Sequence, residues 1–243
     1  MELAGKVAVI TGASKGIGRF VAQELAAAGV DVVLGARHAD TLECVRLEVA
    51  DRGRRATART TDVRDPAQCT ALIETAVQEF GRIDILVNNA GVGAFGATTD
   101  VTDDAWREIL ETNLYGAFYC TRAALPHFQR QKSGHIVNIS SVAGREGIAG
   151  AAAYCASKFG LAGFADALSR EVAEHNIRVS TLYPGRVETA FGGDDDSDDS
   201  GEGSASAMGA RDVARAVRTI VGAGDAVVIE SVVLYPRPSS WEA

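Results

Sequence analysis

Two side chains capable of acid–base chemistry, Tyr154 and Lys158, stand four residues apart in the segment YCASK. If the segment is helical, these residues are neighbours on one face, so the phenol and the ammonium lie side by side. A nearby ammonium favours the phenolate and lowers the tyrosine pKa from its ordinary value of about 10. Such a pair could donate and accept a proton, whereas the plainer interpretation is an amphipathic pair on a helix surface.

A second chemical feature is the glycine-rich turn TGASKGIGRF, in which Gly12, Gly16 and Gly18 have the spacing G-x-x-x-G-x-G. Glycine tolerates unusual backbone angles and close backbone approach. A helix N-terminus offers amide hydrogens to a pyrophosphate. A turn without any ligand would have the same composition, but its place after the first strand of a β-α-β unit favours dinucleotide binding.

The end of the second apolar run distinguishes NADP from NAD. An acid about 20 residues after the glycines binds the NAD ribose, whereas an arginine accommodates the NADP 2′-phosphate. Here Ala36 stands near that position, Arg37 follows it, and Lys15 adds a cation inside the glycine turn. Two cations without a carboxylate indicate a phosphate site, which arginine can hold in bidentate fashion. We therefore predict NADP(H) as the cofactor.

These residues must be positioned by alternating strands and helices. Asp65 before Pro66 is typical of a helix start, and Gly81 of a helix end. The β-α-β-α order implies a parallel, doubly wound sheet with right-handed crossovers. We predict one Rossmann-type α/β domain over 1–243, with a seven-stranded parallel sheet flanked by helices. The expected strands are 6–11, 31–36, 56–60, 83–88, 134–140, 177–184 and 226–235.

Composition excludes several classes of protein. The 243 residues are 47% hydrophobic and 23% charged, which is ordinary for a soluble globular protein. No stretch is apolar for long enough to span a bilayer, and the start, with Glu2 and no basic segment, is unlike a signal peptide. The four cysteines are widely spaced without C-x-x-C, which argues against a metal site or a disulfide framework. Reduced cysteines favour a cytoplasmic location.

The net charge of −8 is concentrated in one segment. Six acids lie within 194–203, so the remainder of the chain carries only −2. The body of the protein therefore lacks the basic field expected of a nucleic-acid or membrane partner. The surrounding segment 192–209 has almost no large apolar residue, and we expect an acidic flexible loop within the domain. Either a solvated loop or a lid that repels anionic substrates fits this composition.

An ordered set of motifs resembles the short-chain dehydrogenase/reductase family. The resemblance extends from Lys6 to about Pro236 and implies an oxidoreductase. The last strand, AVVIESVVLYPRP, lacks the Val-Asp-Gly-Gly type of ending and is similar to the NADP-preferring branch that contains carbonyl reductases. The motifs are TGASKGIG (11–18), NNAG (88–91), ETNLYG around residue 113, IVNISS (136–141), YCASK (154–158) and PGRVET (184–189).

The family's catalytic tetrad corresponds to Asn113, Ser141, Tyr154 and Lys158. The resemblance implies that Tyr154 donates its proton to a substrate carbonyl while Ser141 hydrogen-bonds the same oxygen. Lys158 would also bind the ribose hydroxyls beside the nicotinamide, and Asn113 would hold a water that links Lys158 to a proton relay. We choose Ser141 over Ser140 because the family's serine precedes the tyrosine by thirteen residues.

The resemblance also assigns cofactor contacts. It places adenine contacts after the third strand, ribose contacts in the NNAG segment, and carboxamide and pyrophosphate contacts in the PGRVET loop. The implied set is Gly12, Ser14, Lys15, Gly16, Ile17, Gly18, Arg37, Asp62, Val63, Asn89, Ala90, Gly91, Tyr154, Lys158, Pro184, Gly185, Val187 and Thr189, with no metal.

The implied reaction is NADPH-dependent reduction of a small, mostly neutral ketone or aldehyde, reversible as an alcohol oxidation. The alternatives are a 3-oxoacyl-thioester or polyketide ketoreductase, and a non-catalytic NADP-binding sensor, which the complete tetrad disfavours. Family members are commonly dimers or tetramers, so we expect a homodimer or homotetramer. The expected substrate pocket comprises Val92, Ala94, Phe95, Val142, Ile148, Tyr183 and Phe191, with Arg145, Glu146 and Arg186 nearby.

Overall fold

A seven-stranded sheet forms the centre of the fold. The structure, a computed structural model, describes residues 3–189, 201–204, 207–224 and 226–237. The strand order is β3-β2-β1-β4-β5-β6-β9, and every neighbouring pair is parallel. This confirms the predicted doubly wound α/β architecture. The strands are β1 (Val7–Thr11), β2 (Asp31–Ala36), β3 (Ala56–Thr60), β4 (Ile85–Asn88), β5 (Gly134–Ile139), β6 (Ile177–Pro184) and β9 (Ser231–Leu234).

The strand predictions agree closely with the structure except at the last strand. We expected a strand over 226–235, but β9 covers only Ser231–Leu234. These four residues pair with Thr181–Pro184 of the neighbouring strand β6. Val227 and Val228 remain half exposed. The β-branched composition predicted a longer strand, but in the described part of the chain no residue from 226 to 230 joins the strand register, although the Thr181 amide of β6 donates to the Glu230 carbonyl oxygen at 2.9 Å.

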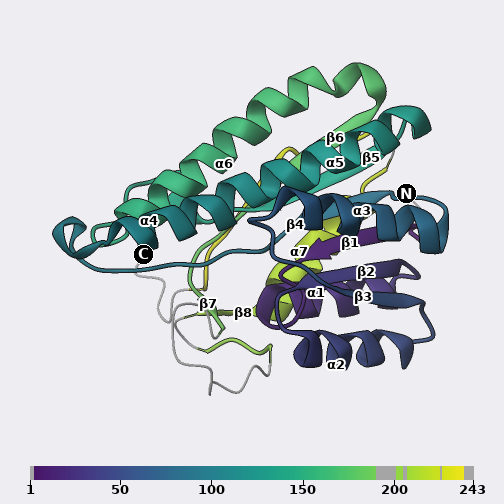
Figure 1. Cartoon of the computed structure of the whole chain (residues 1–243), viewed down its shortest axis with the longest axis horizontal. Coiled ribbons are helices and arrows are strands. Elements are labelled where there is room, and N and C mark those ends of the chain that lie inside the picture. Colours follow the sequence, from purple (N-terminus) through teal and green to yellow (C-terminus); the bar gives the residue numbers. More distant parts are fainter. Residues whose placement is uncertain (1–2, 190–200, 205–206, 225, 238–243) are drawn as a thin grey trace.

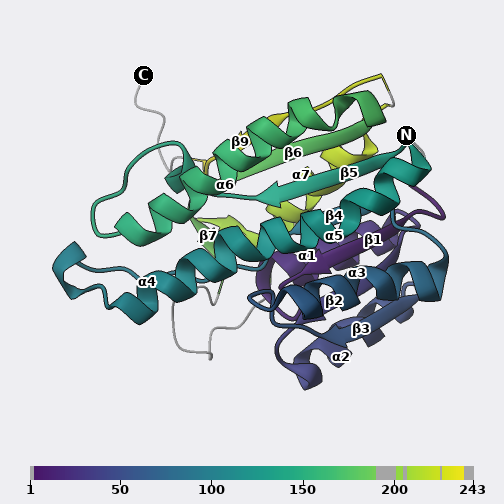
Figure 2. The ribbon, with the colours of Figure 1, turned by 45° about the horizontal axis from the view of Figure 1, so that its top comes forward.

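Helices cover both faces of the sheet (Figures 1 and 2). Side chains alternate across each strand, so Val7 and Val9 of β1 join one hydrophobic core while Ala8 and Ile10 join the other. The core that contains Ala8 and Ile10 includes side chains of α1, α2 and α7, and the core that contains Val7 and Val9 includes those of α3, α5 and α6. The helices are α1 (Gly16–Ala27), α2 (Ala39–Ala50), α3 (Pro66–Phe80), α4 (Asp103–Leu110), α5 (Gly116–Gln131), α6 (Ala152–Glu171) and α7 (Ala210–Gly222).

The predicted ends of α3 are confirmed in detail. Asp65 is the N-cap, and its side chain accepts hydrogen bonds from the amides of Ala67 and Gln68. Pro66 occupies the first turn, where a missing amide hydrogen removes no helical bond. Gly81 ends the helix with φ of 77°, a left-handed conformation that glycine adopts without strain.

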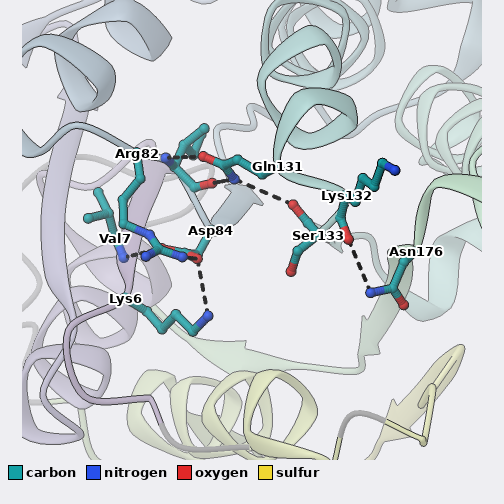
Figure 3. A network of polar contacts seen from close by, with 9 residues as sticks. Lys6, Val7, Arg82, Asp84, Gln131, Lys132, Ser133 and Asn176 are labelled. Carbon is teal, nitrogen blue, oxygen red and sulfur yellow. Dashed lines mark hydrogen bonds and ion pairs between the residues drawn. The ribbon is translucent and has the colours of Figure 1, made fainter.

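A network of polar contacts lies at the edge of the sheet where the strands begin (Figure 3). The buried carboxylate of Asp84 accepts hydrogen bonds from the amide of Val7 at 2.9 Å and from Arg82 Nη2 at 2.6 Å. Lys6 Nζ lies 3.3 Å from the same carboxylate. Because buried charge must be paired, this network fixes the starts of β1 and β4 at the opposite end from the glycine turn.

Only part of the segment predicted as an acidic flexible loop is described. Residues 192–200 and 205–206 lie outside the described residues. Met208–Gly209 forms a short strand, β8, that pairs with β7 (Val187–Glu188). An added Cβ on Gly201 would lie 2.3 Å from the Phe20 ring of α1. The described end of the segment therefore packs closely against α1.

Candidate active site

A cavity of about 320 Å³ lies at the carboxyl ends of the central strands. This is the edge at which open α/β sheets bind ligands. The predicted cofactor residues line it, with Gly18 as the exception, and so do Ser141, Tyr154 and Lys158 of the tetrad. The lining residues that we did not assign to the cofactor or the tetrad are Ala36, His38, Thr61, Val92, Thr112, Ile139 and Ser140.

The glycine turn has the close packing that its sequence predicts. Gly12 and Gly16 have φ of 63° and 54°, which favours glycine. An added Cβ on Gly18 would lie 2.2 Å from the carbonyl oxygen of Gly12. Glycine at this position therefore allows α1 to pass close to the Gly12 backbone. No acid occupies the first turn of α1, and its positive N-terminal end faces the cavity. A pyrophosphate fits this arrangement.

Asn89 connects the glycine turn to the end of β4. Its Nδ2 donates to the carbonyl oxygens of Thr11 at 2.9 Å and Gly12 at 3.0 Å. The hydroxyl of Thr11 accepts from the amides of Asn89 and Ala90, both at 3.0 Å. These bonds join segments almost 80 residues apart in sequence. The spacing of the two motifs gave no signal for Thr11, which we did not single out.

Tyr154 and Lys158 lie on α6, as predicted from their spacing. Lys158 Nζ is 5.6 Å from the centre of the Tyr154 ring. It donates a hydrogen bond of 2.8 Å to the carbonyl oxygen of Ile139, at the end of β5. Lys158 is only 4% exposed. The lysine therefore extends from the helix to the sheet edge, with its ammonium close to the Tyr154 ring.

The pKa values differ from the sequence-based expectation. Burial raises the pKa of Tyr154 to about 12, although a hydrogen bond with Ser141 acts in the opposite direction. Burial also lowers the pKa of Lys158 to about 8. The expected lowering of the tyrosine pKa is therefore not met in this structure, because desolvation is the largest influence on the phenol.

The two adjacent serines have different surroundings. The Ser140 side chain is buried and donates to the carbonyl oxygen of Lys158 at 3.4 Å. Ser141 is half-buried at the cavity, and its Oγ accepts from the amide of Ala143 at 3.2 Å. Of the two, Ser141 is the one that hydrogen-bonds Tyr154. The geometry favours Ser141 as the serine that acts on a substrate oxygen.

Asn113 lies in a π-helical turn, Glu111–Tyr115, between α4 and α5. Its Oδ1 accepts from the amide of Val92 at 2.8 Å, and its Nδ2 donates to the carbonyl oxygen of Val92 at 2.9 Å. Nδ2 also donates to Ser157 Oγ on α6 at 3.0 Å. An added Cβ on Gly91 would lie 3.4 Å from Asn113 Oδ1 and 3.8 Å from Lys158 Nζ. Asn113 thus holds the loop after β4 beside α6.

Beside the expected 2′-phosphate site lies one carboxylate, that of Glu108, which the sequence pattern did not reveal. Arg37 Nη1 and Arg64 Nη1 each lie 3.7 Å from Oε1 of Glu108, on α4. Arg64 also holds Asp62 through Nη2 at 2.6 Å and keeps the pKa of that carboxyl below its usual value. The end of β2 carries no acid, but Glu108, which is distant in sequence, lies next to Arg37 in space.

The expected substrate residues are only partly gathered at the cavity. Val92 lines it, and the Phe95 ring lies 5.9 Å from that of Tyr154 and is 60% exposed. Ile148 is also exposed. Tyr183 lies under the guanidinium of Arg145, 5.4 Å from ring centre to Cζ. Ala94 and Val142 do not line the cavity, and Phe191 lies outside the described residues.

The described residues contain neither a membrane-spanning helix nor a metal-binding cluster. No described helix is long and apolar enough to cross a membrane. The described part of the chain has no group of three or more His, Cys, Asp or Glu side chains arranged to hold a metal ion.

Comparison with known proteins identifies the family. Residues 6–200 match the short chain dehydrogenase family. A candidate ketoacyl reductase of the monensin polyketide synthase from Streptomyces virginiae is 43% identical over 187 residues, or 76% of this chain and 71% of that protein. The 3-oxoacyl-acyl-carrier-protein reductase FabG of Salmonella typhimurium is 39% identical over 189 residues, covering 78% and 76% of the two chains.

The fold comparison agrees. A metagenomic short-chain oxidoreductase, solved in complex with NADP, has a TM-score of 0.84 and 34% sequence identity. That alignment covers 98% of this chain and 99% of the other. The family match over most of the chain, together with these relatives, shows that the protein is an oxidoreductase of the short-chain dehydrogenase/reductase family.

Proposed function

We propose that the protein is an NADPH-dependent reductase that converts a ketone or aldehyde into an alcohol, with Tyr154 as the proton donor. The observation that carries this proposal is the arrangement of one cavity. The glycine turn at the start of α1 lines this cavity together with Ser141, Tyr154 and Lys158. A dinucleotide laid across the sheet edge would bring its nicotinamide to the tetrad, as this fold generally does.

The bound nicotinamide would supply the hydride. Tyr154, with a pKa of about 12, is protonated at neutral pH and therefore has a proton to donate to a carbonyl oxygen. The Ser141 hydroxyl would donate a hydrogen bond to the same oxygen and stabilise the alkoxide that develops there. The ammonium of Lys158 would stabilise the phenolate left after proton transfer. Asn113 would keep Val92 and α6 in register beside this site.

These pKa values favour the reductive direction. Alcohol oxidation needs Tyr154 as a phenolate, and its raised pKa opposes that state at neutral pH. Added positive charge near the phenol would lower the pKa of Tyr154, and Lys158 supplies such charge only while it is protonated. Because the pKa of Lys158 is about 8, this support declines in mildly alkaline solution.

Two observations support NADP(H) over NAD(H). Arg37 and Lys15 line the cavity at the end expected to hold the adenosine ribose. The similar metagenomic oxidoreductase was solved with NADP. The guanidinium of Arg37 can hold a phosphate with two charge-assisted hydrogen bonds.

The substrate is proposed to be a neutral ketone or aldehyde with an apolar substituent. Phe95 and Ile148 present exposed apolar side chains from the loops that flank Tyr154. The amide of Gly96 donates to the carbonyl oxygen of Gly150 at 2.8 Å, which joins these two loops. An apolar substituent packed on Phe95 would place its carbonyl beside the phenol.

A second candidate is reduction of a 3-oxoacyl or polyketide thioester. The relatives named as ketoacyl reductases favour it. Their alignments cover about three quarters of this chain, and the family match ends at residue 200. The identity therefore supports the shared cofactor and proton chemistry more strongly than a shared substrate.

We also propose a homodimer or homotetramer in the cytoplasm. Exposed aromatic side chains gather on α4, α5, the π-helical turn and α6, where a second copy would cover them. These residues are Trp106, Tyr115, Phe118 and Phe159.

The test is turnover with NADPH against NADH, using neutral alkyl and aryl ketones, aldehydes and an acetoacetyl thioester. We expect NADPH-dependent reduction of the neutral carbonyl compounds. Tyr154→Phe should lower kcat by about 10³-fold or more, because the proton donor is lost, with NADPH affinity retained. The best substrate distinguishes the two candidates. Turnover that survives in the Tyr154→Phe variant would contradict the proposed proton donor.

A further inference from the structure

Glu108 lies between the two arginines at the adenosine end of the cavity. A single carboxylate oxygen, Oε1, is 3.7 Å from Arg37 Nη1 and 3.7 Å from Arg64 Nη1. Arg37 follows β2, Arg64 follows β3, and Glu108 comes from α4. Arg37 lines the cavity, whereas Glu108 and Arg64 are not among its lining residues. The carboxylate therefore approaches Arg37 from outside the cavity.

The two arginines are held differently. Arg64 grips Asp62 through Nε at 3.0 Å and Nη2 at 2.6 Å, so only its Nη1 is directed at Glu108. Within the described residues, Glu108 is the sole ion-pair partner of Arg37. Asp62, Glu108 and the two arginines together carry no net charge. The positive potential that Arg37 creates in the cavity is thus reduced by the Glu108 carboxylate, which lies outside the cavity.

A phosphate is the stronger ligand for this guanidinium. It carries more negative charge than a carboxylate at neutral pH and offers more acceptor oxygens. An arginine can meet it with two parallel hydrogen bonds. The 3.7 Å separation between Arg37 and Glu108 is too long for a hydrogen bond, so Arg37 can turn to a phosphate without breaking one. Glu108 and a phosphate on the ribose are like charges that share one cation.

We propose that Glu108 is a specificity-determining residue that competes with the 2′-phosphate of NADP(H) for Arg37 and so limits the preference for NADP(H) over NAD(H). This inference rests on the proposed cofactor preference. The prediction is that neutralising Glu108 strengthens binding of 2′-phosphorylated ligands alone. Ligands without that phosphate do not use Arg37 in this way and should bind as before.

The experiment is calorimetric titration of wild type and Glu108→Gln with NADPH, NADH, adenosine 2′,5′-bisphosphate and adenosine 5′-monophosphate. Arg37 and Glu108 are 48% and 45% exposed, so the effect is that of a solvent-screened pair. We expect NADPH and the bisphosphate to bind about 2- to 5-fold tighter to the variant. The affinities for NADH and the monophosphate should not change. High salt should reduce the difference.

The matched control is Asp104→Asn. It removes one negative charge from the same helix, where Asp104 pairs with Arg107 at 3.3 Å and does not contact Arg37. We expect wild-type affinities for all four ligands. If Asp104→Asn gained as much affinity for NADPH and the bisphosphate, the effect would come from net charge alone, and the proposal would be overturned. Unchanged or weaker bisphosphate binding by both Glu108→Gln and Glu108→Ala, or an equal gain with the monophosphate, would also overturn it.

Failure of the proposed function gives a different result. Wild type that binds NADPH no more tightly than NADH would contradict the cofactor preference itself. The comparison of the bisphosphate with the monophosphate still decides the role of Glu108 in that case, because neither fragment contains the nicotinamide.

Discussion

Lys158→Met should change how the stability of this protein depends on pH. Lys158 is buried, and its pKa falls from 10.5 to about 8 because burial penalises the charged amine. Below pH 8 the lysine is protonated in the folded and unfolded states alike, and folding carries the desolvation cost of the ammonium. A shift of this size corresponds to about 3 kcal/mol at low pH.

The sign follows from proton binding. Between pH 8 and 10.5 the unfolded chain retains a proton that the folded protein has released, so the free energy of unfolding rises with pH. Integration of this difference from pH 7 to pH 9.5 gives a gain of about 2 kcal/mol for wild type. The methionine variant lacks the titrating group and should lack the gain. Stopping at pH 9.5 avoids most of the titration of Tyr154, whose pKa is raised in the folded protein.

The assay is urea unfolding followed by circular dichroism at pH 7, 8, 9 and 9.5 and constant ionic strength. The difference between the two proteins at any single pH also contains the lost hydrogen bond to Ile139, worth about 1 kcal/mol. The slope with pH is therefore the quantity to compare. Lys132→Met, at an exposed lysine, is the control and should follow wild type. Parallel pH profiles for wild type and Lys158→Met would refute the reasoning.

Two further predictions concern packing and the substrate. Gly134→Ala would place a Cβ 2.4 Å from the Phe128 ring and should destabilise the protein by about 1–3 kcal/mol in urea unfolding. Gly163→Ala, where an added Cβ meets nothing within 4 Å on an exposed part of α6, should stabilise it by about 0.5–1 kcal/mol; equal effects of the two changes would contradict the packing argument. Phe95→Ala should lower kcat/KM about 10-fold or more for an aryl ketone but little for acetone, since Phe95 packs beside Tyr154 and burying such a ring contributes about 1.5–3 kcal/mol. An equal loss for both ketones would show that Phe95 has no role in substrate choice.

The burial of Lys158 connects stability with function. An apolar residue at this position would avoid the cost of desolvating an ammonium. The structure instead places the amine between the Tyr154 ring and the end of β5. Under the proposed function, the charge is needed there when Tyr154 gives up its proton. Stability lost to a functional charge is a common compromise in enzymes.

The sequence alone determined the features that depend on local pattern. Short strand-like runs, most of them apolar, predicted six of the seven strands to within two residues at each end, since most buried parallel strands need apolar side chains on both faces. Asp65, Pro66 and Gly81 predicted the ends of α3, because capping is a local interaction. The spacing of Tyr154 and Lys158 placed both on one helix, because that geometry depends only on the helical repeat.

The tertiary structure alone decided what distant segments do to one another. Glu108 follows Arg37 by about 70 residues, and only the tertiary fold brings its carboxylate on α4 to the guanidinium. The pKa directions of Tyr154 and Lys158 likewise depend on burial by the surrounding chain, which no spacing encodes. Local periodicity fixes which residues share an element, whereas desolvation and ion pairing are set by neighbours that the folded chain brings together.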